Sequence, residues 1–99
     1  MTEHPLKPIE DIDPKLFNLI EQTRQLALGD GALPRKVKLL IAIALDAAHG
    51  SVDGVASLSR VAMQAGATKE EIAEALRVAQ YISGVGSIYT ASRALKQLS

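Results

Sequence analysis

The stretch LPRKVKLLIAIALDAAHG, residues 33–50, decides the fold class. Its middle, residues 37–48, is apolar almost all round and is interrupted only by Lys38 and Asp46. A helix with apolar side chains on every face has to be buried on several sides, within its own domain or between subunits. The stretch therefore predicts a central helix, and Gly50 suits the left-handed backbone that commonly ends one.

Shorter amphipathic segments flank this helix, and each has its own start and stop signals. The start signals include an Asp-Pro pair, an N-capping serine and the capping box TKEE. The expected helices begin at Asp13-Pro14, Pro34, Ser51, Thr68 and Ser87, and glycines end or separate them at 29–31, 50, 66 and 84–86. On the helix after Thr68, the expected core face runs from Ile72 to Ile82. No segment alternates like a strand, so the sequence predicts an all-α domain of about five helices.

The predicted domain covers residues 13–99, and residues 1–12 precede it as an extended N-terminal arm. The arm contains Pro5 and Pro8 and has no helical period. Because proline removes a backbone donor, two prolines in a short aperiodic segment favour extended chain.

The composition predicts self-association. The 99-residue chain is 47% hydrophobic but only 3% aromatic, so its core has to be built from Ala, Leu, Ile and Val. Such small side chains let helices approach closely but bury little apolar area each. A single domain of this size is marginally stable on its own, and oligomerisation is a common remedy. We therefore expect a homo-oligomer.

Charge and residue usage exclude several classes of protein. The 11 basic and 11 acidic residues balance and are spread along the chain, which disfavours nucleic-acid binding. The chain has no cysteine, so thiolate chemistry is excluded, and a cytoplasmic location is expected. With two histidines, neither a metal site nor a cofactor is expected. The longest apolar run, residues 39–45, is too short to span a membrane, and no signal peptide opens the chain.

Three segments together resemble the carboxymuconolactone decarboxylase family, which includes the AhpD-like alkylhydroperoxidases. They are LPRKVKLLIAIALDAAHG, RVAMQAGATKEEIAEAL and VAQYISGVGSIYTASRAL, at residues 33–50, 60–76 and 78–95. The resemblance implies an AhpD-like helical domain that assembles as a trimer, or as a hexamer built from dimers.

The resemblance also shows which catalytic groups are missing. In the redox branch of the family, a Cys-x-x-Cys opens the third helix, a histidine follows it, and a glutamate lies early in the second helix. The matching positions here are Ser51 and Gly54 for the cysteines, Leu58 for the histidine and Leu39 for the glutamate. A serine hydroxyl cannot cycle through a sulfenic acid or a disulfide, so alkylhydroperoxidase or peroxiredoxin-type activity is the least expected function. The decarboxylase branch also lacks the cysteines but keeps a histidine near the Leu58 position.

Four polar residues near the break after the central helix are the remaining catalytic candidates. His49 could act as an acid–base group oriented by Asp46 or Asp53, with Ser51 or a water as the group acted upon. The structural alternative is that His49 and Asp53 complement helix dipoles and Ser51 caps a helix. Asp46 would then form an ion pair with His49, Arg60 or a neighbouring subunit.

The sequence thus leaves two main functions open. The first is a non-redox oligomer that binds a small molecule, such as a small organic acid, or a protein partner. The second is an acid–base enzyme, a decarboxylase or isomerase of a small organic acid, that uses His49 with Asp46 or Asp53.

Overall fold

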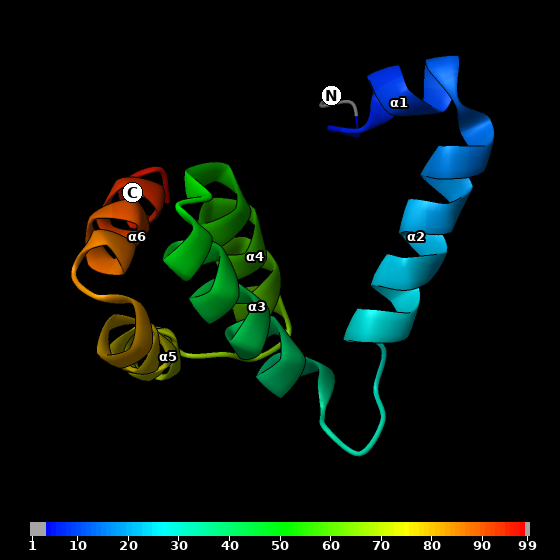
Figure 1. Ribbon diagram of the computed structural model, residues 1–99. Helices are drawn as coiled ribbons and strands as arrows, with labels where there is room; N and C mark the ends of the chain where they lie inside the picture. The colour runs from blue at the N-terminus through cyan, green and yellow to red at the C-terminus, as the bar shows by residue number, and fades with distance from the viewer. Residues whose placement is uncertain (1–3, 99) are drawn as a thin grey trace.

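The computed structural model describes residues 4–98, and within them the chain forms six helices and no strand (Figure 1). The helices are α1 (Lys7–Ile12), α2 (Pro14–Leu28), α3 (Arg35–His49), α4 (Val52–Gln64), α5 (Lys69–Ser83) and α6 (Gly86–Lys96). The all-α prediction is confirmed. No helix in the described residues is long and apolar enough to cross a membrane.

The predicted extended arm is wrong for residues 7–12, which form α1. Pro8 lies in the first turn of this helix, where its missing N–H costs no hydrogen bond. The Lys7 ammonium lies 2.9 Å from the Asp11 carboxylate and 3.6 Å from that of Glu10, so one lysine supports the only full turn of α1. Residues 1–3 of the predicted arm lie outside the described residues.

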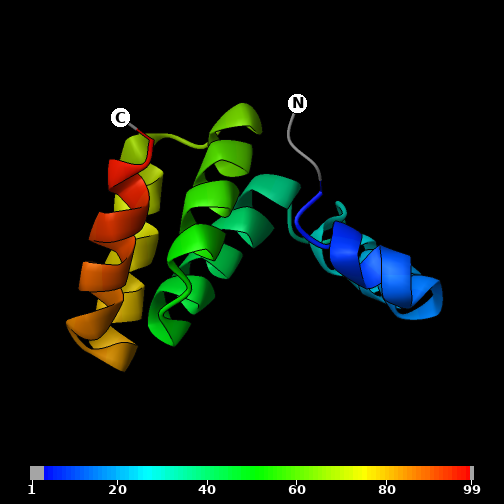
Figure 2. The ribbon, with the colours of Figure 1, turned by 90° about the horizontal axis from the view of Figure 1, so that it is seen from above.

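Helices α3 to α6 form a four-helix body in which α3 is central, as predicted (Figures 1 and 2). α3 packs against α4, α5 and α6, and α6 packs against α4 and α5. Leu39 and Ile43 of α3 are completely buried. Small side chains surround them and allow the close packing that the composition indicated, namely Ala47, Val55, Ala56, Ala62, Ala79, Ala91 and Ala94.

Helices α1 and α2 stand apart from this body, as both ribbon views show (Figures 1 and 2). No residue of α2 is buried, and only Leu28 at its end packs against the core. Leu16, Leu19 and Leu26 are exposed on one side of α2, and together they form an uncovered apolar stripe. His4 contacts α2 instead: its ring meets Phe17 edge to face, and its Nε2 lies 3.1 Å from the Glu21 carboxylate.

On α5 the capping box is confirmed, but one expected core residue is not buried. Thr68 and Glu71 cap the helix reciprocally, as the sequence predicts. Ile82, however, is 74% exposed. Ile72 and Ala79 are two helical turns apart, share one side of α5 and are both buried. At about 3.6 residues per turn, Ile82 does not lie on that side. Val78, Tyr81, Val85 and Tyr89 are exposed in the same region.

Candidate functional site at the junction of α3 and α4

The predicted break between the second and third expected helices is the junction of α3 and α4. Gly50 has a φ of +80°, so it supplies the left-handed turn that ends α3. The Ser51 N–H donates a hydrogen bond of 2.9 Å to the Asp46 carbonyl and closes that turn. Ser51 then precedes α4, but its side chain makes no capping hydrogen bond. The junction is a tight and well-defined corner.

The positions that the resemblance assigns to the catalytic cysteines differ in their surroundings. Ser51 is exposed, whereas Gly54 lies in the first turn of α4 beneath the Asp46 carboxylate. A Cβ on Gly54 would lie only 2.8 Å from Asp46 Cγ and would overlap the carboxylate oxygen. Any side chain at this position, a cysteine included, would have to displace Asp46.

The other two positions are parts of the hydrophobic core. Leu39, at the glutamate position, is completely buried, and Leu58, at the histidine position, is half-buried and packs against the core. These leucines contribute apolar contacts, and their side chains have no group that can donate or accept a proton. The proton-transfer path of the redox branch is thus replaced by packing.

The four candidate acid–base residues are close in sequence, but the structure does not join them. Asp46 is half-buried, while His49, Ser51 and Asp53 are exposed. Among residues 4–98, no side-chain hydrogen bond or ion pair links Asp46 or Asp53 to His49. Arg60, an expected partner of Asp46, donates its Nη2 to the Gln97 carbonyl at 3.4 Å instead. An acid–base group at this corner stays a prediction that the geometry does not favour.

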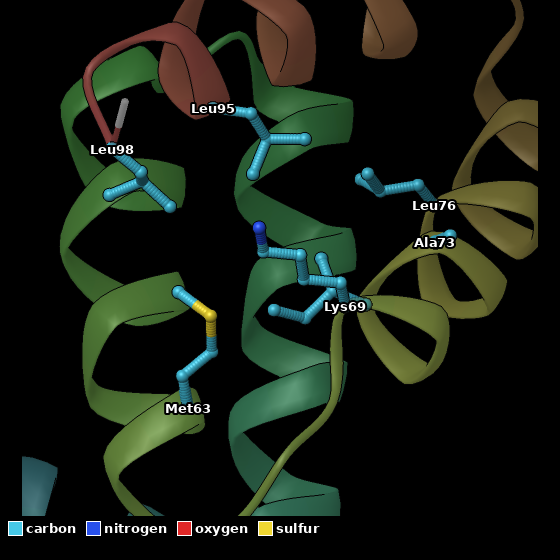
Figure 3. Close-up of a pocket in the computed structure, with 7 residues that line it drawn as sticks. Met63, Lys69, Ala73, Leu76, Leu95 and Leu98 are labelled. Carbon is cyan, nitrogen blue, oxygen red and sulfur yellow. The ribbon is translucent and has the colours of Figure 1, made fainter.

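The best-formed cavities of the described residues lie away from this corner. One cavity, of about 310 Å³, lies between α4, α5, α6 and the residues that follow α6 (Figure 3). A wider groove, of about 480 Å³, runs between α3 and α5, past Ile41 and Val78. Neither cavity could be predicted from the sequence, because cavities form where helices that are distant along the chain meet. The one signal in the sequence was Lys69, a lysine that precedes an otherwise apolar helix face.

Metal binding gains no support from the described residues. No group of three or more His, Asp or Glu side chains among residues 4–98 is placed to hold a metal ion. Asp46 and Asp53 each lie near the first turn of α4, where the helix dipole favours negative charge. A structural role for both carboxylates is therefore sufficient to account for their positions.

Comparison with known proteins agrees with this picture of the fold. Residues 14–97 match the model of the carboxymuconolactone decarboxylase family. The structure is similar to the crystal structure of the apo form of a carboxymuconolactone decarboxylase family protein from Legionella pneumophila, with a TM-score of 0.86 and 34% sequence identity. That likeness covers 92% of this chain and 81% of the other. A search among curated proteins found no match. The chain belongs to the carboxymuconolactone decarboxylase family.

Proposed function

We propose that this protein is a non-redox member of the family that works as a homo-oligomeric binding protein for a small molecule or a partner. The observation that carries the proposal is the contact between Asp46 and Gly54. At this corner a carboxylate occupies the space that a second thiol would need. Since the chain also has no cysteine elsewhere, thiol peroxidase chemistry has no group to carry it.

Self-association is supported by apolar surface that the single chain leaves uncovered. Leu19 is 60% exposed and Leu26 is 84% exposed on α2, and Tyr81 is 83% exposed on α5. The open groove between α3 and α5 adds an apolar surface to these. Apolar patches of this kind mark interaction sites, and each side chain of leucine size contributes about 1.5–3 kcal/mol when it is fully buried. A second copy of the chain is the expected partner, because a domain this small buries too little apolar surface to be very stable alone.

Two measurements on the purified protein test this proposal. Light scattering coupled to size exclusion should give the mass of a trimer or a hexamer. An assay with cumene hydroperoxide and a dithiol reductant should give no turnover above the buffer rate. A monomeric mass would contradict the oligomer, and hydroperoxide turnover that His49→Ala abolishes would contradict the non-redox assignment.

A further inference from the structure

The cavity between α4, α5 and the end of the chain's described part has the size and the lining of a small-molecule pocket. Its volume of about 310 Å³ lies at the lower end of the range for small-molecule pockets, roughly 300–1,000 Å³. Its walls are apolar, apart from one lysine: Met63, Lys69, Ile72, Ala73, Leu76, Leu95 and Leu98. Figure 3 shows that these side chains converge on one space from α4, α5, α6 and the residues that follow α6.

Lys69 is the charged residue of this lining. Its side chain reaches from the first turn of α5 into the cavity, with the ammonium pointing toward Leu95 of α6 and Leu98, which follows that helix (Figure 3). Among residues 4–98, no carboxylate lies within ion-pair distance of this ammonium. A lysine ammonium is strongly hydrated and prefers either water or an anion. Its place at the edge of an apolar space leaves one side open for an anionic group.

The acidic residues of the same turn do not neutralise this ammonium. Glu71 is held by Thr68 and by Lys36, whose ammonium lies 3.0 Å from the Glu71 carboxylate. Glu70 is exposed and does not line the cavity. Lys69 is also the first residue of α5, so the positive end of that helix dipole adds to its charge.

We propose that this cavity binds a straight-chain monocarboxylate of medium length, with its carboxylate at Lys69 and its chain along Met63, Leu76 and Leu98. The apolar walls offer a phosphate or a sugar no further hydrogen bonds, whereas a hydrocarbon chain gains burial along its length. Met63 has an unbranched, adaptable side chain that can fit such a chain closely. The inference rests on the proposed function in one respect: it names the ligand of the binding protein.

Decanoate, used below its micelle concentration, is the probe that tests this ligand class. The chain has two methionines, so protein labelled with ¹³C at the methionine methyls gives one signal from Met63 and one from Met1. Decanoate should shift the Met63 signal saturably and leave Met1 as the reference. 1-Decanol, which lacks the charge, should bind more weakly.

Two variants with one control assign the binding to this cavity. Lys69→Met should weaken decanoate binding by about fivefold and leave 1-decanol binding unchanged, because it removes a charge-assisted contact and keeps the apolar stem. Lys96→Met, which removes a charge outside the cavity, is the control. Ala73→Trp should fill the cavity and abolish binding of both probes. Ala73 is exposed, so the variant should keep the helical circular dichroism of the parent.

The outcomes separate this inference from the proposed function. A Met63 signal that does not respond to decanoate, or that responds equally in Lys69→Met, overturns the ligand class. A Met63 signal that shifts on dilution of the protein but not with decanoate overturns it too, since a second copy would then fill the cavity. In these cases an oligomeric mass and the absence of hydroperoxide turnover would still support the proposed function. Saturable decanoate binding by a monomeric protein would support the ligand class and contradict the homo-oligomer of the proposed function.

Discussion

The carboxylate of Asp46 packs against Gly54, so that the last turn of α3 closes over the first turn of α4. The contact explains why a charged residue interrupts the apolar central helix. A carboxylate beside a helix N-terminus is stabilised by the helix dipole, and the absent side chain of glycine makes the room. The two residues act as one structural unit at the corner where the redox branch places its thiols.

A double-mutant cycle measures this unit. Alanine favours a helix over glycine by about 1 kcal/mol, so Gly54→Ala should stabilise a protein that already carries Asp46→Ala. In the wild-type background, the new methyl group must displace the Asp46 carboxylate, and the gain should disappear or reverse. We expect a coupling energy of about 1 kcal/mol from urea unfolding of the four proteins.

A glycine elsewhere controls for helix propensity in this cycle. A Cβ on Gly86, the first residue of α6, would meet no atom within 4 Å. Gly86→Ala should therefore have the same effect with and without Asp46→Ala. If the Gly54→Ala and Asp46→Ala effects add within about 0.5 kcal/mol, the carboxylate does not occupy the space above Gly54.

Ser59 carries a buried hydroxyl without a partner, and we expect its removal to stabilise the protein. The side chain has no accessible surface, and its Oγ has no hydrogen-bond partner among the described residues. An unsatisfied buried polar group costs about 1–3 kcal/mol. Ser59→Ala should therefore raise the free energy of unfolding by about 1 kcal/mol in urea. Ser57→Ala, exposed on the same helix, measures the helix propensity part alone, and an equal effect of both variants would refute the prediction.

Glu71 makes the stability of α5 depend on pH. The backbone hydrogen bond from Thr68, together with the ammonium of Lys36, holds the pKa of Glu71 below its usual value of 4.5. A lowered pKa means that the unfolded chain binds the proton more tightly than the folded one. The stabilisation is complete above pH 4.5 and is lost as the pH falls through the lower pKa of the folded state.

Thermal unfolding between neutral and acidic pH checks this dependence. The Tm of the wild type should fall more steeply below pH 4.5 than that of Glu71→Gln, because the amide cannot titrate but still accepts the Thr68 hydrogen bond. Glu74→Gln, on the same helix, forms no ion pair among the described residues and should follow the wild type. Parallel curves for the wild type and Glu71→Gln would show that this carboxylate does not carry the effect.

The local features of this chain could be predicted from the sequence, because each depends on neighbours along the chain. The left-handed Gly50 and the capping box of Thr68 and Glu71 are set by a few adjacent residues. Burial of Leu39 at the centre follows from an apolar pattern on all sides of one helix. Family membership followed from longer matching segments.

What the sequence could not give depends on contacts between distant segments. Helix α1 is stabilised by ion pairs of Lys7, and the two prolines of this segment do not indicate them. The contact between Asp46 and Gly54 and the cavity at Lys69 form only when the helices dock. The separation of α2 from the body is also a tertiary property. The apolar stripe of α2, with Leu19 at its centre, has the same pattern as the stripe of a helix that is packed in a core.

We expect copies of the chain to meet through the uncovered apolar stripe of α2. Leu19→Glu places a charge in the middle of the stripe and should shift the oligomer toward monomer in light scattering at micromolar concentration, because a carboxylate is costly to bury in an apolar contact. Asn18→Glu introduces the same charge about 100° away from Leu19 around α2 and off the stripe, where it should leave the mass unchanged. Both variants should keep the helical circular dichroism of the parent, since neither residue is buried within the chain. If Leu19→Glu assembles like the wild type, the stripe of α2 is not the surface through which the copies meet.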